Sequence, residues 1–316
     1  MPDQMGGGDI AFPGLGIYLE DVPQGFHIFG FYVAFYGLII GIGVVLAFLT
    51  ISHLAKKYKH NPDDYYLLGC FLVLFGVLGA RLYYVIFSWD YYKHHLSSIF
   101  NIRQGGLAIY GGIIAGLLVI IVWCKIKKRK IPQVGDIVVP GVLVGQILGR
   151  WGNFFNREVF GTYSDSFLAM RLPVEAVRAE DIDEAIRAHM EPGTNYIQVH
   201  PTFLYESLYN LVLFILIMIF HKKKKFNGEV MLWYFGGYGI GRFVIEGIRT
   251  DRLLIGHTNI AVSQLLGIVL FAAALIIDVV VRILMKKKGI TKADEQELVT
   301  EAAEETETVK ATSEEV

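Results

Sequence analysis

Long apolar runs separated by shorter polar segments make up most of the chain. Seven runs of spanning or near-spanning length lie at residues 28–54, 65–88, 106–124, 134–150, 202–220, 229–248 and 257–284. A helix crosses the hydrocarbon core of a bilayer with about 20 apolar residues, so each run predicts a transmembrane helix. Pro140 and several glycines weaken the prediction for the fourth and shortest run. The pattern therefore predicts an all-α polytopic membrane protein with seven transmembrane helices.

Basic residues follow every second run. The even-numbered connections carry only scattered charges, whereas lysines and arginines cluster after the first, third, fifth and seventh runs: Lys56, Lys57, Lys59, Lys125, Lys127, Lys128, Arg129, Lys130, Lys222–Lys225, Arg282 and Lys286–Lys288. Cytoplasmic loops of membrane proteins are enriched in Lys and Arg. The pattern predicts that the N-terminus lies outside and the C-terminus lies in the cytoplasm.

Two polar segments interrupt or follow this pattern. Residues 163–199 are predicted to form a small extracytoplasmic cap between helices 4 and 5. Within the cap, residues 174–190 predict an amphipathic helix that begins after Pro173 and ends at Pro192. Residues 291–316 are acidic and poor in large apolar side chains, which predicts a disordered cytoplasmic tail. The expected domain organisation is a membrane domain at residues 1–290, with the cap inserted, and this tail.

Composition supports one polytopic domain and excludes several other classes. The 316 residues are 53% hydrophobic, and the mean hydropathy is +0.45. Both cysteines, Cys70 and Cys124, lie in or beside apolar runs, so no disulfide framework is expected. The nine histidines form no metal-ligand spacing, and no P-loop or hydrolase motif is present. We therefore expect no metal, no cofactor and no nucleic-acid partner.

Small residues recur at an interval that suits close helix packing. Glycines four residues apart occur in four of the predicted helices, at Gly37 and Gly41, Gly112 and Gly116, Gly141, Gly145 and Gly149, and Gly237 and Gly241. Such spacing lets membrane helices approach closely. We interpret these glycines as structural.

The most informative stretch is residues 149–161, which has the sequence GRWGNFFNREVFG. It places Arg150 at the end of an apolar run, and an arginine at the centre of a membrane helix costs about 2.5–3.5 kcal/mol on insertion scales. Arg150, Asn153 and Asn156 are spaced by three residues and share a helix face. A cation and two amides suit a phosphate or carboxylate ligand. The alternative is an interfacial arginine that snorkels to headgroups while the asparagines cap the helix end.

Other polar residues of the predicted helices lie on the same side of the membrane. At about 1.5 Å per residue, the following lie within about one leaflet of the outer surface: Tyr36, Arg81, Tyr110, Arg150, Glu206, Arg242 and Glu246. This distribution predicts an outer-leaflet pocket for an anionic amphiphile such as a phospholipid. Three alternatives remain open: a charge ladder of Arg242, Glu246 and Arg249, an interface anchor at Arg81, and a capping or orienting role for His200.

The stretch also resembles the signature of the bacterial prolipoprotein diacylglyceryl transferases, because residues 149–161 fit the pattern GRxGNFxNxExxG at every fixed position. Further matching segments occur in the same order along residues 15–285, at residues 36–38, 79–82, 105–112, 200–206 and 241–246. The resemblance therefore covers most of the chain.

The resemblance implies a reaction and its partners. Enzymes of this family transfer the diacylglyceryl group of phosphatidylglycerol to the thiol of the lipobox cysteine in a prolipoprotein signal peptide. A thioether forms and glycerol phosphate leaves, which is the first step of bacterial lipoprotein maturation. The expected location is the bacterial plasma (inner) membrane, among membrane lipids, with the active site facing the outer leaflet.

The resemblance also implies roles for individual residues. We expect four to be catalytic, namely Arg150, Arg242, Tyr110 and Glu246, and seven to bind substrate, namely Tyr36, Arg81, Asn153, Asn156, Glu158, His200 and Glu206. The two catalytic arginines would stabilise the charge that grows on the departing phosphate.

Tyr110 departs from many family members, which carry a histidine at this position. A phenol with a pKa of about 10 is a poor base at neutral pH, so we expect Tyr110 to position a group rather than deprotonate the thiol. Glu206 and Glu246 remain as weak candidates for the base, and the alternative for Tyr110 is the aromatic belt of the membrane interface.

Two kinds of function compete with the transferase. A transporter or lipid-binding protein would use the same pocket without chemistry, but it predicts polar groups along both leaflets and an internal repeat, and the sequence has neither. A lipid scramblase or another headgroup transferase is a further alternative.

Overall fold

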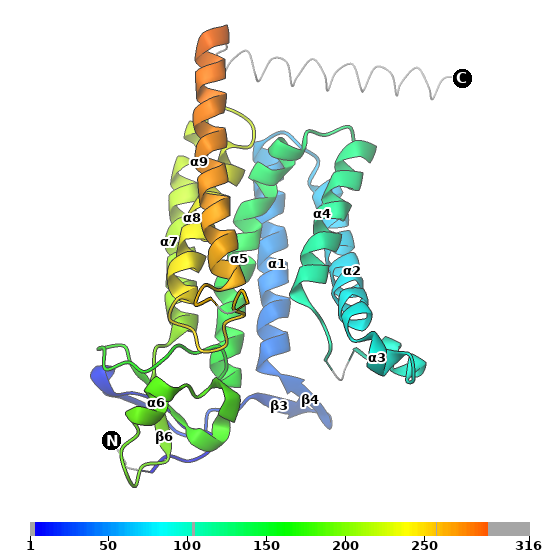
Figure 1. Ribbon diagram of the computed structural model, residues 1–316. Coiled ribbons are helices and arrows are strands. Elements are labelled where there is room, and N and C mark those ends of the chain that lie inside the picture. The colour runs from blue at the N-terminus through cyan, green and yellow to red at the C-terminus, as the bar shows by residue number, and fades with distance from the viewer. Residues whose placement is uncertain (1–3, 103–104, 257, 290–316) are drawn as a thin grey trace. The chain divides into compact units, whose positions relative to one another are not determined.

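The computed structural model describes residues 4–102, 105–256 and 258–289, and the predicted acidic tail lies outside the described residues. Within them, seven long helices correspond one to one with the seven apolar runs (Figure 1). They are α1 (Phe35–Lys57), α2 (Pro62–Phe87), α4 (Ile109–Ile126), α5 (Ile131–Asn156), α7 (Thr202–Phe220), α8 (Glu229–Glu246) and α9 (Val262–Lys288). Pro140 lies inside α5 without ending it.

Six of these helices are long and apolar enough to cross a membrane, which makes the chain a polytopic membrane protein. The exception is α8, whose 18 residues include Glu229, Arg242 and Glu246. Shorter helical segments are α3 (Trp89–Tyr92), α6 (Glu184–Ala188), η1 (Pro13–Leu15), η2 (Leu96–Phe100), η4 (Val174–Ala176), η5 (Ala179–Asp181) and η6 (His221–Lys223).

Two small sheets distinguish the structure from the all-α class that the sequence predicts. A four-stranded antiparallel sheet has the order β2-β1-β5-β6, from the strands β1 (Ile10–Phe12), β2 (Ile17–Leu19), β5 (Met170–Pro173) and β6 (Tyr196–Val199). Ala11 pairs with Arg171, so the N-terminal segment forms one sheet with the cap. Ile10, Leu172, Ile197 and Ile186 are buried in one core that also contains Phe154 of α5 and Phe203 of α7. The protein is mostly helical, with a mixed cap.

The predicted helix over residues 174–190 is wrong. The segment instead forms η4, η5 and the five-residue helix α6, with extended backbone at Arg178 and Ile182 between them. The physical reason is a local competitor for the backbone: the carboxylate of Asp183 accepts a hydrogen bond from the Ile186 amide at 2.7 Å and starts a new helix. Ile186 is nevertheless buried, as the amphipathic pattern predicts.

The first helix is shorter than the apolar run that predicts it. It begins at Phe35, because the preceding residues form a separate hairpin of β3 (Gly25–Ile28) and β4 (Phe31–Ala34). Its strands pair in register from Gly25 with Ala34 to Ile28 with Phe31. Hydropathy alone does not separate an apolar hairpin from the apolar helix that follows it.

The described chain forms two compact units, residues 1–43 with 142–316 and residues 44–141. In each unit, two helices meet directly through glycine backbones. A Cβ added at Gly111 would lie 2.3 Å from the carbonyl oxygen of Gly79 between α2 and α4, and one at Gly239 would lie 2.4 Å from that of Gly267 between α8 and α9. Only a residue without a side chain permits this approach.

The glycine spacing in the sequence identifies only some of these contacts. Gly112, Gly116, Gly141, Gly237 and Gly241 do face neighbouring helices. Among the described residues, a Cβ at four other predicted packing positions would meet nothing within 4 Å: Gly37, Gly41, Gly145 and Gly149. The interval of four residues therefore marks a helix face, and the partner helix decides whether that face is used.

Candidate functional site

A buried carboxylate, Glu206, joins two arginines in the first unit. Glu206 lies in the second turn of α7 and is only 3% exposed. Its Oε1 accepts a hydrogen bond from Nη1 of Arg242 at 2.9 Å, and its Oε2 lies 2.6 Å from Nε of Arg150. The second contact is an ion pair without hydrogen-bond alignment, so Oε2 has no hydrogen-bond donor among the described residues. A carboxylate this deep requires paired cations, and α5 and α8 each supply one.

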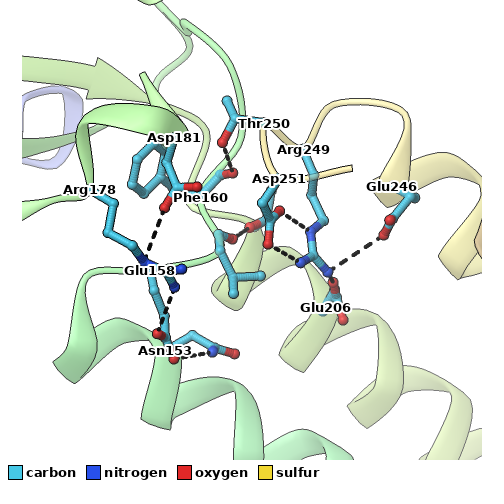
Figure 2. A network of polar contacts seen from close by, with 12 residues as sticks. Asn153, Glu158, Phe160, Arg178, Asp181, Glu206, Glu246, Arg249, Thr250 and Asp251 are labelled. Atoms are coloured by element: carbon cyan, nitrogen blue, oxygen red, sulfur yellow. Dashed lines mark hydrogen bonds and ion pairs between the residues drawn. The ribbon is translucent and has the colours of Figure 1, made fainter. Parts of the chain in front are cut away.

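The charge network continues into the loop after α8 (Figure 2). Arg242 also donates to Glu246 one turn later on α8. Arg249 lies 3.5 Å from Glu246 and 3.8 Å from Glu206, and it donates to both carboxylate oxygens of Asp251 at 2.9 and 2.7 Å. The charge ladder of α8 is therefore present and extends to Glu206 on another helix. Three arginines and three carboxylates give this cluster a formal charge near zero.

The two arginines that the sequence predicts as catalytic differ in the donors they leave available. Both Nη groups of Arg242 are engaged, by Glu206 and Glu246. Arg150 contacts Glu206 through Nε, and within the described chain its two Nη groups have no hydrogen bond or ion pair. The Arg150 side chain is 20% exposed. Arg150 thus presents an open guanidinium fork of the kind that binds phosphate or carboxylate in a bidentate manner.

Glu158 holds the two asparagines of the signature stretch. Helix α5 ends at Asn156, and Arg157 follows in a left-handed conformation with a φ of 54°. The chain then turns back, and the Glu158 amide donates to the carbonyl oxygen of Asn153 at 3.1 Å. The Nδ2 groups of Asn153 and Asn156 both donate to Oε1 of Glu158, at 3.1 and 3.3 Å. Arg178 of the cap reaches the other oxygen of this carboxylate at 3.5 Å.

Two glycines of the signature stretch are required by close neighbours. A Cβ at Gly152 would lie 2.6 Å from the ring of Tyr36, so this ring packs directly on α5 beside Asn153. A Cβ at Gly161 would lie 2.8 Å from both the carbonyl oxygen of Ile248 and Cβ of His200. Gly161 also forms a bridge with Arg249. These glycines bring the end of the stretch against the other site segments.

His200 lies between β6 and α7 and contacts the hydroxyl of Tyr205 through Nδ1 at 3.3 Å. Burial lowers the pKa of its imidazole, although the charge of Asp165 opposes the shift. The His200 carbonyl oxygen accepts from the Gly161 amide at 2.9 Å, and the structure gives its ring no contact with Glu206 or the arginines. This geometry favours the orienting role that the sequence left open.

The pKa values of two carboxylates outside the long helices shift in opposite directions. Burial raises the pKa of Asp251, but the hydrogen bonds and charge of Arg249 outweigh it, so the net pKa lies below the ordinary value. Burial raises the pKa of Asp181 and outweighs the opposing charge of Arg178, and the charges of Asp251 and nearby glutamates add to the rise. Asp181 therefore holds a proton to a higher pH than Asp251 does.

Arg81 and Tyr110 belong to the second unit. All five N–H groups of Arg81 donate to carbonyl oxygens, namely those of Ser98, Ile99, Asn101, Gly105 and Gly106. This arrangement favours a structural role in holding that loop over a direct substrate contact. Tyr110 is the second residue of α4 and is 38% exposed, and its hydroxyl has no hydrogen-bond partner in the described part of the chain.

Three further residues in or near the cluster were not predicted as site residues. Arg249 and Asp251 complete the network, and only the three-residue spacing from Glu246 to Arg249 signals it in the sequence. Arg157 is 4% exposed and donates to the carbonyl oxygens of Gly8 and Val22, both at 2.5 Å. It joins the N-terminal segment to the signature stretch, and no sequence pattern announces that contact.

The surroundings of Glu206 offer room for water but no metal site. A cavity of about 10 Å³ lies beside Glu206 and Arg242, lined also by Tyr209, Asn210 and Tyr238. This is close to the space that one water molecule needs. No group of three His, Cys, Asp or Glu side chains in the described residues is arranged to hold a metal ion.

Comparison with known proteins assigns the family. The family model described as prolipoprotein diacylglyceryl transferase matches residues 23–280. A protein of Finegoldia magna named phosphatidylglycerol--prolipoprotein diacylglyceryl transferase is 40% identical over 272 residues, which cover 86% of this chain and 98% of that protein. Proteins of the same name from Lactobacillus acidophilus and Clostridium botulinum are 42% and 39% identical, over 84% and 78% of this chain and 92% and 93% of theirs. This chain therefore belongs to the prolipoprotein diacylglyceryl transferase family.

Proposed function

We propose that this protein transfers the diacylglyceryl group of phosphatidylglycerol to the lipobox cysteine of prolipoproteins, the first step of lipoprotein maturation. The names of its relatives support the reaction. The observation that carries the proposal is the open guanidinium fork of Arg150. This arginine belongs to the signature stretch, and the buried Glu206 holds it in place. Such a fork suits the phosphate of a phospholipid better than a neutral ligand.

The reaction requires stabilisation of a leaving phosphate. The cysteine thiolate attacks the glyceryl carbon that is bonded to the phosphate oxygen. A carbon–sulfur bond forms, the carbon–oxygen bond breaks, and its electron pair leaves on the phosphate oxygen of glycerol phosphate. Negative charge grows on that oxygen in the transition state, so preorganised arginine donors lower the barrier. The thiol proton passes to a base.

We assign the phosphate contact to Arg150 and a supporting role to Arg242. Glu206 and Glu246 engage both Nη groups of Arg242, which fixes its position but leaves fewer donors for a ligand. Glu206 positions both arginines, and Arg249 balances the charge of Glu246 and Glu206. Asn153, Asn156 and Glu158 shape the loop at the end of α5, and Tyr36 packs on Gly152 within that helix.

The substrate thiol also needs activation. A free cysteine has a pKa of about 8.5, and nearby cations lower it. Neighbouring arginines would favour the thiolate in the same way that they favour the phosphate. Arg150 and Arg242 contact both carboxylate oxygens of Glu206, so we assign Glu206 to positioning rather than to proton transfer. We assign Tyr110 a positioning role, in which its hydroxyl orients the headgroup or the thiol.

We further propose seven spans in a bacterial plasma membrane, with the N-terminus and cap outside and the C-terminus in the cytoplasm. The alternating basic residues support this orientation. The charges that lower the hydropathy of α8 support it as the seventh span, because each is paired. Arg242 and Glu246 belong to the cluster, and Glu229 accepts from Arg282 of α9. Intramembrane charges of this kind are typical of functional sites.

The proposal is tested by reconstituting the purified protein in bilayers that contain phosphatidylglycerol and adding a synthetic lipobox peptide. Mass spectrometry should show a diacylglyceryl mass gain on the peptide cysteine. A peptide with serine in place of that cysteine and bilayers of phosphatidylcholine alone serve as controls. A folded protein that modifies neither peptide in phosphatidylglycerol bilayers would refute the proposed activity.

A further inference from the structure

The β3–β4 hairpin has one apolar face. In its register, Phe26 pairs with Val33 and Ile28 pairs with Phe31. Because side chains alternate between the faces of a strand, these four residues share one side of the hairpin. His27 and Tyr32 share the other side, where their rings lie 5.3 Å apart. The hairpin is therefore amphipathic, with a wholly apolar side.

The tip of the hairpin is unusual for a turn in water. Phe29 and Gly30 connect the strands with φ values of 48° and 83°, so both central residues are left-handed. Two-residue turns of this kind strongly favour Asn-Gly or Asp-Gly, since other side chains are strained there. This chain instead places a phenylalanine in the strained position, and its ring is 98% exposed. Local turn preference does not account for an aromatic residue here.

The apolar face is largely uncovered by the unit to which it belongs. Phe31 is 77% exposed and Ile28 is 45% exposed. Only the base is packed: the Phe26 ring contacts Phe35, and Phe35 contacts Phe155 of α5. A contiguous exposed apolar surface of this kind indicates an interaction surface.

The position of the hairpin identifies what it contacts. The Phe35 amide donates to the Gln24 carbonyl oxygen at 2.9 Å, which closes the base of the hairpin directly at the start of α1, a candidate membrane span. Residues 25–34 contain no lysine, arginine, aspartate or glutamate. A surface of aromatic and aliphatic side chains at the end of a membrane helix matches the lipid interface, where aromatic residues concentrate.

We propose that the β3–β4 hairpin is a lipid-inserted anchor, which places Phe29 and the face of Phe26, Ile28, Phe31 and Val33 in the membrane interface at the N-terminal end of α1. Insertion is shallow, because a two-stranded hairpin has unpaired backbone groups on both outer edges that cannot enter the hydrocarbon core. Interfacial elements typically bury their apolar face by about 5–10 Å. Binding is independent of headgroup charge, since the hairpin contains no lysine or arginine. The inference does not depend on the proposed catalytic activity.

Spin labels along the hairpin test the proposal. Single cysteines are placed at positions 27, 28, 29, 31 and 32 in the full-length protein with Cys70→Ser and Cys124→Ala, and each is labelled in phosphatidylcholine nanodiscs. Collision with oxygen, which concentrates in lipid, is compared with collision with an aqueous nickel complex. Labels at 28, 29 and 31 should favour oxygen several-fold over those at 27 and 32. The control is a label in place of Phe167 of the cap, which is 66% exposed and should favour nickel.

A second variant separates anchoring from folding. Phe29→Asn suits the left-handed turn and preserves the hairpin, but it removes the ring. In this variant the label at position 28 should move toward the aqueous phase. Two results would overturn the proposal. In the first, the label at 29 is as accessible to nickel as the control label. In the second, the labels at 28, 29 and 31 are shielded from both oxygen and nickel. The second result would indicate a covering protein, such as another copy or the peptide substrate.

Discussion

At the scale of single residues, the electrostatic balance around Glu206 decides which arginine is available to a ligand. Three arginines and three carboxylates lie within one network, so an incoming phosphate finds no large excess of positive charge. The hydrogen-bond donors that remain available to it are the Nη groups of Arg150. Removing one partner of a buried pair typically costs about 3–5 kcal/mol, because a charge is left uncompensated. We therefore regard Glu206 as the residue that holds both arginines in place.

Tyr110 allows a test between positioning and proton transfer. Tyr110→Phe removes only the hydroxyl that would position the substrate, so it should lower the transfer rate. Tyr110→His again places a hydrogen-bonding group on a ring and should restore part of that rate. The positioning role predicts no new ionisation near pH 6.5, the ordinary imidazole pKa, in the pH profile of Tyr110→His. Full activity of Tyr110→Phe would instead assign this residue to the aromatic belt. A new limb in the histidine profile would favour a base.

Asp181 predicts a pH dependence of stability in the cap. Its pKa is raised in the folded protein, so the folded state binds the proton more tightly than the unfolded state does. Its favourable contribution is complete below the ordinary value of 3.8 and is lost as the pH rises through the raised value. Asp181→Asn should therefore raise the melting temperature at pH 7 relative to wild type and reduce that gain toward pH 4. A lower melting temperature of Asp181→Asn at pH 7 would contradict this account. The control is Glu191→Gln, at an exposed position whose charge is not among those that shift the pKa of Asp181.

Four of the six charged residues of this network, Arg150, Glu206, Arg242 and Glu246, stand out in the sequence for a chemical reason. Charged and amide side chains at the ends of apolar runs stand out because burying them is costly. Asp251 lies in a polar loop, where charges carry no such signal, so its place in the network is visible only in three dimensions. Arg249 is signalled only by its spacing of three residues from Glu246. The difference between Arg150 and Arg242 likewise depends on which atoms of Glu206 each one contacts.

At the scale of elements, the contact of α8 and α9 depends on two glycines. Gly239→Ala would place a Cβ 2.4 Å from the carbonyl oxygen of Gly267, which a backbone shift must relieve. Overpacking of this kind typically costs about 1–3 kcal/mol, so the melting temperature in detergent should fall. The matched control is Gly145→Ala, where a Cβ meets nothing within 4 Å of the described residues. In a helix this change should be neutral or stabilising. Equal stability of the two variants would show that the α8–α9 glycine contact is unimportant.

Helices were predictable and strands were not, because their signals differ in length. Each of the seven long helices corresponds to an apolar run of many residues. Strands β1 and β5 have three and four residues, and their pairing joins segments about 160 residues apart in the sequence, which no local pattern encodes. The predicted cap helix does not form as one element, because Asp183 caps the start of the separate short helix α6. The β3–β4 hairpin was concealed inside an apolar run.

At the scale of the whole molecule, the proposed orientation is tested with two fusions. A reporter that is active only outside the cytoplasm should be active when fused after Ser164 in the cap. The same reporter should be silent after Lys224, in the basic segment between α7 and α8. As the control, immunoblots should show equal amounts of the two fusion proteins. The reverse pattern would place the cap in the cytoplasm and would contradict an outer-leaflet site.

Our main proposal is that Arg150 binds the phosphate of phosphatidylglycerol while the diacylglyceryl group passes to the thiol of the lipobox cysteine. It is tested most directly by measuring, in one reaction, the mass gain on a lipobox peptide and the release of glycerol phosphate. Wild type, Arg150→Lys and Arg242→Lys are compared at equal amounts of folded protein in the same bilayers. Lysine keeps the charge but cannot form the bidentate contact.

The account predicts equal yields of modified peptide and glycerol phosphate for wild type. It predicts a rate lower by about 10²–10³ for Arg150→Lys, the loss typical of one transition-state donor, and a smaller loss for Arg242→Lys, whose Nη groups are already engaged. Wild-type turnover in Arg150→Lys, or release of glycerol phosphate without modification of the peptide, would contradict it.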